Sequence, residues 1–160
     1  MFKNSFFAIA IAFVLAGTGW GCNQDIRKRL PGSYLTEIQD YENSCNPDDP
    51  GPPEWSPLLV RIDAATETDF DFTFGTEKDA LVVPDVSVDR HGAWNASYPW
   101  RLPNLYNDLT LDITGNGDGD AVTATLTLNV LPLPGDTGPS PVCYLAITIS
   151  GPRCDETCSY

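Results

Sequence analysis

The sequence predicts an all-β fold, a single antiparallel β-barrel or β-sandwich of seven or eight strands. From Leu30 onward, apolar and polar residues alternate with a period of two, and Gly, Pro, Asn and Asp interrupt the alternation at short intervals. No segment of this region has the apolar spacing of an amphipathic helix. Short alternating segments between turn residues are typical of both barrels and sandwiches, so the two architectures remain open.

The strands in the first half of this region are short. Alternation predicts strands at 33–39 and 58–63, and it is clearest at 68–75, where three phenylalanines alternate with polar residues. Weaker alternation predicts further strands at 80–83, 86–89 and 94–98. Two long connections stand out, 42–57 and 92–108, and the second includes the weak strand at 94–98. Connections of such length are usually tied down or functional.

A β-hairpin is the strongest element of the second half. Leu109, Leu111 and Ile113 alternate with polar residues, and the alternation resumes from Val122 to Val130 with threonines on the opposite face. The residues between the two segments, GNGDGD, suit a tight turn. A last strand is predicted at 142–150. Each of these strands should place one face in a core and the other in water.

The turn in this hairpin also has some features of a calcium loop. With Thr114 at position one, Asn116, Asp118 and Asp120 fall at positions three, five and seven. Position twelve is Thr125 rather than glutamate, and strands rather than helices flank the segment. Because a tight turn needs the same residue types, we expect a turn and no metal site here.

Residues 1–21 are typical of an export signal. Lys3 supplies a positive charge, Ser5–Ala16 is an apolar run of twelve residues, and small residues follow. The run is shorter than a membrane-spanning helix. The sequence GWGC, ending at Cys22, resembles the lipobox of bacterial lipoprotein precursors, with Gly21 before the cleavage point. This resemblance implies a signal peptide over 1–21, a palmitate-type lipid on Cys22, and a short linker over 22–31.

The residue after Cys22 is Asn23 and not the aspartate that resembles an inner-membrane retention signal. We therefore expect a lipid-anchored protein of the cell envelope, in the outer membrane of a Gram-negative bacterium. The alternative is cleavage by a general signal peptidase, which Gly19 and Gly21 also suit. The protein would then be secreted, and Cys22 would remain unmodified.

The cysteine count agrees with lipidation of Cys22. The other four, Cys45, Cys143, Cys154 and Cys158, form an even set, which in an exported protein predicts two disulfide bonds. Four cysteines allow three pairings, and the pairing that we favour is Cys45 with Cys143 and Cys154 with Cys158. The absence of a C-x-x-C pair argues against zinc.

The charge excludes one class of partner. The chain has a formal net charge of −13, and from Leu30 onward it has 21 acidic and 5 basic residues. Such a surface repels nucleic acid, so no nucleic-acid partner is expected. The basic triplet Arg27–Arg29 follows the proposed anchor closely, where it could contact an anionic leaflet or serve only as a solvated linker.

The ends of the β-domain, residues 32–160, are similar to those of the lipocalin and wider calycin barrels. In LPGSY, Gly32 matches the glycine and Tyr34 the aromatic residue of the G-x-W motif, and Arg153 follows the last strand in ISGPR. The resemblance implies a lipocalin-like barrel in which the Arg153 guanidinium packs across the Tyr34 ring and closes the barrel base. It further implies a small apolar ligand inside the barrel.

An aromatic segment between His91 and Tyr106 is the other candidate site. Its rings could stack on sugars or line a hydrophobic cavity, or they could serve packing, with Trp94 and Tyr98 in the core. The candidate residues are His91, Trp94, Tyr98, Trp100 and Tyr106.

No catalytic constellation is evident, because the single histidine has only Asp89 nearby in sequence and no nucleophile motif accompanies it. We therefore expect a binding protein without a cofactor rather than an enzyme. Its alternative role is an interaction module of β-sandwich type that binds protein or glycan at the cell envelope.

Overall fold

The computed structural model describes residues 25–49, 51, 57–75, 80–100, 108–133, 135, 138, 140–154 and 158. A short 3-10 helix, η1 (Ile26–Lys28), precedes eight strands. The strands are β1 (Gly32–Asn43), β2 (Leu58–Ala64), β3 (Asp69–Phe74), β4 (Leu81–Ser87), β5 (Ala93–Trp100), β6 (Leu109–Gly117), β7 (Ala121–Val130) and β8 (Cys143–Cys154). The predicted all-β class is confirmed.

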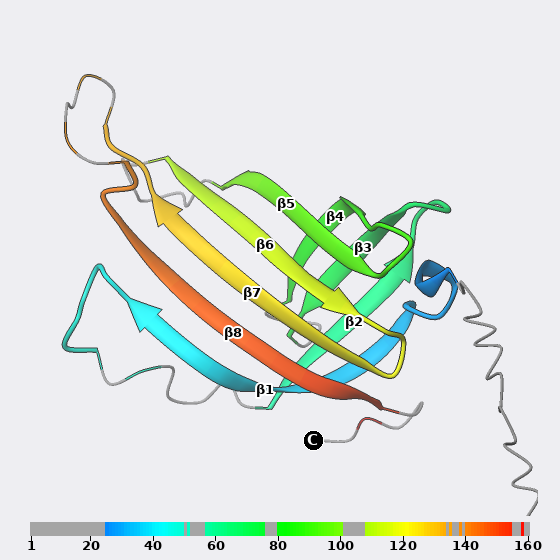
Figure 1. Cartoon of the computed structure of the whole chain (residues 1–160). Coiled ribbons are helices and arrows are strands. Elements are labelled where there is room, and N and C mark those ends of the chain that lie inside the picture. The colour runs from blue at the N-terminus through cyan, green and yellow to red at the C-terminus, as the bar shows by residue number, and fades with distance from the viewer. Residues whose placement is uncertain are drawn as a thin grey trace, which may run out of the picture.

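All eight strands belong to one antiparallel sheet, in the order β4-β3-β2-β1-β8-β7-β6-β5. The sheet curls into a nearly closed barrel (Figure 1). Its edge strands, β4 and β5, meet at an isolated bridge between Val88 and Trp94. The Tyr98 hydroxyl of β5 also donates a hydrogen bond to the Pro84 carbonyl of β4. Of the two predicted architectures the structure is therefore the barrel, because all the strands of the described residues belong to this one curled sheet.

Strand β4 differs from its prediction. Instead of separate strands at 80–83 and 86–89, the structure has one strand with a bulge at Pro84 and Asp85, where the register with β3 shifts. Proline has no N–H to donate, and Asp85 adopts a φ of 55° and donates its N–H to the Asp71 carboxylate. The bulge interrupts the alternation and explains why the sequence resembles two strands.

The two ends of the barrel differ in their connections. At one end the connections are short, spanning 65–68, 88–92 and 118–120, and η1 lies beside them (Figure 1). The Ile26 N–H donates to the Arg90 carbonyl at 3.1 Å, which fixes η1 against the second of these turns. At the other end the connections span 44–57, 75–80, 101–108 and 131–142. We call these the η1 end and the loop end.

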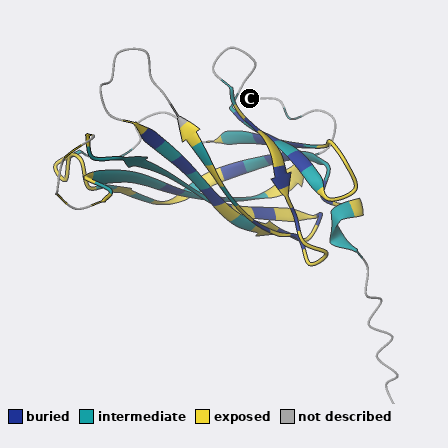
Figure 2. Cartoon of the chain, turned by 90° about the horizontal axis from the view of Figure 1, so that it is seen from above, coloured by how far each residue is buried: buried dark blue, intermediate teal, exposed yellow. Residues whose placement is uncertain are grey.

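Buried side chains fill the barrel near the η1 end, and on β3 and β6 they continue to the loop end at Phe74 and Leu109. Buried residues alternate with partly buried or exposed residues along the strands (Figure 2), as the period of two predicts. The Phe72 and Trp94 rings lie against each other with centroids 4.9 Å apart. Leu30, which follows η1, has no exposed surface and fills the core at the η1 end. The other fully buried side chains include Tyr34, Phe70, Ile62, Ile113 and Ile149.

The outer face of β6, β7 and β8 is a polar surface of hydroxyl and amide groups. Thr125 and Thr148 share a hydrogen bond of 3.0 Å between neighbouring strands, and Thr123 and Ser150 share one of 2.9 Å. The Asn129 amide donates to the Asp112 carboxylate. Cross-strand pairs of this kind stabilise the solvent face of a sheet.

Candidate functional site

Arg153 joins the end of β8 to the segment between η1 and β1. Its Nη1 donates to the Arg29 carbonyl at 2.8 Å and to the Gly119 carbonyl at 3.2 Å. Its Nη2 donates to the Pro31 carbonyl at 2.7 Å. One guanidinium therefore links three segments of the η1 end, since the fork geometry of arginine reaches several acceptors at once.

Gly32 and Tyr34 lie beside this guanidinium. Tyr34 is paired with Arg153 across β1 and β8, and a Cβ on Gly32 would lie 2.7 Å from Nη2 of Arg153. A side chain at position 32 would therefore have to displace this guanidinium, whereas glycine leaves room for it. The Tyr34 ring is fully buried, its hydroxyl donates to the Leu30 carbonyl at 2.6 Å, and burial raises its pKa. The three residues of the calycin resemblance thus meet at one end of the barrel.

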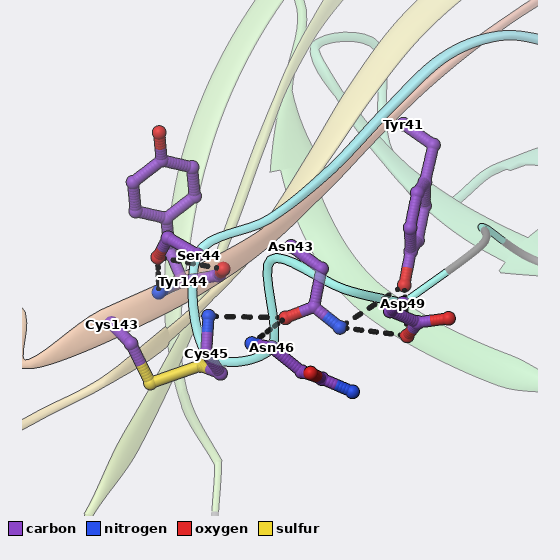
Figure 3. Close-up of a disulfide and its surroundings, with 8 residues drawn as sticks. All are labelled: Tyr41, Asn43, Ser44, Cys45, Asn46, Asp49, Cys143 and Tyr144. Atoms are coloured by element: carbon purple, nitrogen blue, oxygen red, sulfur yellow. Dashed lines mark hydrogen bonds between the residues drawn. A yellow bond between two sulfur atoms is a disulfide. The ribbon is translucent and has the colours of Figure 1, made fainter.

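The cysteines pair as Cys45 with Cys143 and Cys154 with Cys158, and the pairing favoured from the sequence is confirmed. The first bond joins the 44–57 connection to the start of β8 at the loop end, with a Cα–Cα distance of 5.0 Å (Figure 3). The Ser44 hydroxyl supports the same junction by accepting the Tyr144 N–H at 2.7 Å.

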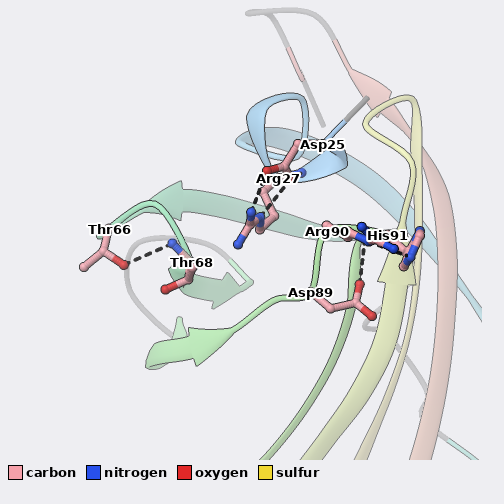
Figure 4. Close-up of polar contacts among 7 residues, drawn as sticks. All are labelled: Asp25, Arg27, Thr66, Thr68, Asp89, Arg90 and His91. Carbon is pink, nitrogen blue, oxygen red and sulfur yellow. Dashed lines mark hydrogen bonds and ion pairs between the residues drawn. The ribbon is translucent and has the colours of Figure 1, made fainter. Parts of the chain in front are cut away.

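The aromatic segment does not form one cluster among its described residues. His91 is exposed in the 88–92 turn, where its Nε2 accepts a hydrogen bond from Arg90 (Figure 4). Trp94 is 4% exposed and lies in the core, and Tyr98 lies across the β4–β5 edge. The Trp100 side chain and Tyr106 lie outside the described part of the structure.

The basic triplet at the η1 end is largely engaged with carboxylates. Arg27 forms two hydrogen bonds with Asp25, through Nε at 2.8 Å and Nη2 at 2.5 Å (Figure 4). Arg29 pairs with Asp120 at 2.8 Å, and Lys28 is exposed. A groove of about 490 Å³ beside η1 is lined by Asp25, Arg27, Lys28, Pro31, Ala64, Thr66, Glu67 and Phe70. Its lining carries charges of both signs.

Asp118 organises the β6–β7 turn as a hydrogen-bond acceptor. Its Oδ1 accepts the N–H groups of Asp120 and Ala121, each at 2.8 Å. These bonds, that of Ala121 first, lower the Asp118 pKa. Within the described residues, no three His, Cys, Asp or Glu side chains are grouped as metal ligands.

The loop half of the barrel has an apolar inner wall that is only partly buried. On β7, inward-facing Val122 and Ala124 are buried, whereas Leu126, Leu128 and Val130 on the same face are only half-buried. Strands β8 and β1 continue this pattern, whereas the inward residues Leu109 and Leu111 of β6 are buried. We call the half-buried inward residues of β1, β7 and β8 the inner wall. It consists of Ile38, Tyr41, Leu126, Leu128, Val130 and Leu145.

A polar cluster lies at the loop-end edge of the inner wall. The Tyr41 hydroxyl and the Asn43 amide both donate to Oδ2 of Asp49 at 2.8 Å (Figure 3). The side-chain Oδ1 of Asn43 accepts the N–H groups of Cys45 and Asn46, which turns the chain back toward Tyr41. We call Tyr41, Asn43 and Asp49 the rim cluster.

The rim cluster holds an ionised carboxylate. Hydrogen bonds from Tyr41, Asn43 and the Gly51 N–H lower the Asp49 pKa, with Tyr41 the largest contribution. Sequence reasoning did not single out this cluster. The only available signal was that Tyr41 and Asn43 continue an alternating segment directly before the NPDD turn.

Comparison with protein-family models, with curated proteins and with solved structures finds no match. The eight-stranded, nearly closed barrel is consistent with a lipocalin-like fold. In the described part of the chain, no helix has the length and apolar character needed to cross a membrane.

Proposed function

We propose that this protein is an exported, lipid-anchored lipoprotein of the cell envelope that binds a small apolar ligand in the loop half of its barrel. The observation that carries the proposal is the inner wall. Its apolar side chains face inward and remain partly exposed. Sites for apolar ligands are concave and are lined by such side chains. A barrel with a core filled at both ends would instead bury all inward residues equally.

The position of the proposed anchor supports this role. Cys22 precedes Asp25, the first residue of the η1 end, by three residues, which span at most about 11 Å when fully extended. An acylated Cys22 would therefore hold the η1 end near the membrane. The loop end would face away from the membrane, where a ligand can reach it from the aqueous side. We propose the outer membrane of a Gram-negative bacterium as the location.

The two disulfide bonds agree with an exported protein. Disulfide bonds form and persist in oxidising compartments such as the bacterial periplasm. Their pairing uses Cys45, Cys143, Cys154 and Cys158 and leaves Cys22 for acylation. This arrangement is what the lipoprotein proposal requires.

A second candidate role is an interaction module that binds glycan or protein at the envelope. The observation that favours it is the outer face of β6, β7 and β8, where hydroxyl and amide groups of Thr125, Thr148 and Asn129 are arrayed across strands. Such groups can donate to and accept from the hydroxyls of a neutral glycan. Binding at this face would not depend on the inner wall.

A pair of substitutions on β7 separates the two roles. Leu128→Gln places an amide on the inner wall, and Thr127→Gln makes a similar change on the adjacent outer position. We expect the wild-type domain to bind the neutral apolar probe N-phenyl-1-naphthylamine. Leu128→Gln should weaken binding about tenfold, because a leucine contact contributes about 1.5 kcal/mol or more, and Thr127→Gln should leave it unchanged.

Fluorescence titration of the probe measures these affinities, and near-UV circular dichroism checks that each variant is folded. A folded wild-type domain that does not bind the probe would contradict the ligand-binding proposal. Equal loss in both variants would also contradict it, because the outer position does not face the wall.

A further inference from the structure

We propose that the ligand is a cationic amphiphile, with its apolar chain along the inner wall and its ammonium group at the Asp49 carboxylate. The inference rests on the proposed function and adds the chemical class of the ligand. The inner wall is apolar, whereas the rim cluster at its edge is polar and carries a carboxylate.

The register places the rim cluster on the inner side of the barrel. Tyr41 pairs with Ile147 and Asn43 pairs with Leu145 across β1 and β8, so both side chains share the inward face with these apolar residues. Tyr41 packs against the core cluster, and its hydroxyl reaches Asp49. The Asp49 carboxylate therefore lies directly beyond the last apolar residues of the wall.

The Asp49 carboxylate is fixed in position and, counting its contacts with the described residues, has acceptor capacity left. Its Oδ2 accepts the Tyr41 hydroxyl and the Asn43 amide, and its Oδ1 accepts the Gly51 N–H at 3.2 Å. A carboxylate oxygen can accept two hydrogen bonds, so Oδ1 can take a further donor. An alkylammonium group supplies such a donor with a positive charge, and charge-assisted hydrogen bonds are the stronger kind.

The charge of the loop end favours a cation and disfavours an anion. The described residues of the four connections at this end include three aspartates and no lysine or arginine. Strand β1 adds Asp40 and Glu42 near the same end. In contrast, the basic residues Arg27, Lys28, Arg29, Arg90 and Arg153 lie at the η1 end. The negative electrostatic potential of the loop end would repel an alkanoate and attract an alkylammonium.

The experiment displaces bound N-phenyl-1-naphthylamine with three amphiphiles of equal chain length, all below their micelle concentrations at neutral pH. Dodecylamine is a cation, dodecanoate an anion and dodecanol neutral. Wild-type protein should require at least about tenfold less dodecylamine than dodecanoate for half displacement, with dodecanol between them.

Two variants assign the preference to one side chain. Asp49→Asn should remove most of the preference for dodecylamine over dodecanol and leave only what the other acidic residues of the loop end supply. The carboxylate is lost, while the amide can still accept from Tyr41. Asp48→Asn removes the same charge from the exposed neighbouring position and should retain the preference. An equal loss in both variants would overturn the contact with Asp49.

The failures of the two proposals are distinguishable. If wild-type protein does not bind the naphthylamine probe, the proposed apolar site is wrong. If the probe binds but the three amphiphiles displace it equally, or dodecanoate displaces it best, the apolar site stands and the cationic ligand class is overturned. The comparison of the three amphiphiles on wild-type protein remains decisive even if Asp49→Asn fails to fold.

Discussion

Replacing Cys45 and Cys143 together by serine is expected to lower the free energy of unfolding by about 4 to 5 kcal/mol. The bond closes a segment of 98 residues, from the end of β1 to the start of β8. A cross-link over such a segment removes much of the conformational freedom of the unfolded chain. The same bond fixes Cys45, and Asp49 of the rim cluster follows Cys45 by four positions. The variant should therefore also lose affinity for ligand.

Urea unfolding under oxidising conditions measures the change, and the second disulfide bond supplies the control. Cys154 and Cys158 are separated by only four residues, so replacing both by serine should cost about 2 kcal/mol at most. Equal losses in the two double variants would contradict the argument from segment length.

Leu30→Ala is expected to lower the free energy of unfolding by about 3 kcal/mol. Leu30 has no exposed surface and fills the core at the η1 end, and a Cβ on Gly117 would lie 2.6 Å from its Cδ1. Truncation leaves a cavity. The surrounding strands cannot shift to fill it, because the hydrogen bonds from Arg153 to the Arg29 and Pro31 carbonyls fix this end of the barrel.

A matched control for this variant is Val82→Ala, because Val82 is 55% exposed and should change stability by less than about 0.5 kcal/mol. Both changes are measured by denaturant unfolding. Leu30→Ala should leave probe affinity unchanged in the folded protein, since Leu30 lies at the end opposite the inner wall. A loss of probe affinity with full stability would place the ligand at the η1 end instead.

The strand faces could be predicted from the sequence because alternation directly reports which side chains share a face. On β6, Leu109, Leu111 and Ile113 are all buried, as their spacing predicts. The same rule explains the aromatic segment. Trp94 and Tyr98 are an even number of positions apart on β5, so both face inward, whereas His91 belongs to the preceding turn.

The joining of all eight strands into one sheet could not be predicted in the same way. Period-two alternation is the same in a sandwich and in a barrel, and the difference depends on β1 pairing with β8, more than one hundred residues away in sequence. The bulge at Pro84 and Asp85 likewise depends on a side chain of the neighbouring strand, Asp71. These are tertiary contacts without a local signature.

The rim cluster was missed for a related reason. Asp49 follows β1 by six residues, and the turn held by the side-chain Oδ1 of Asn43 brings it back to Tyr41. In sequence it is one of two adjacent aspartates in a proline-rich connection. The neighbouring cysteine pairing was easier to predict, because an even set in an exported protein restricts the choices to three.

Native mass spectrometry of the mature protein, purified gently from the membranes of the producing cells, tests the central claim most directly. We predict a chain that begins at Cys22, carries acyl groups there, contains two disulfide bonds, and retains a non-covalent ligand of low mass. An unacylated chain with a free Cys22 would contradict the anchor. A chain that carries no ligand under these conditions and binds no apolar probe afterwards would contradict the binding role.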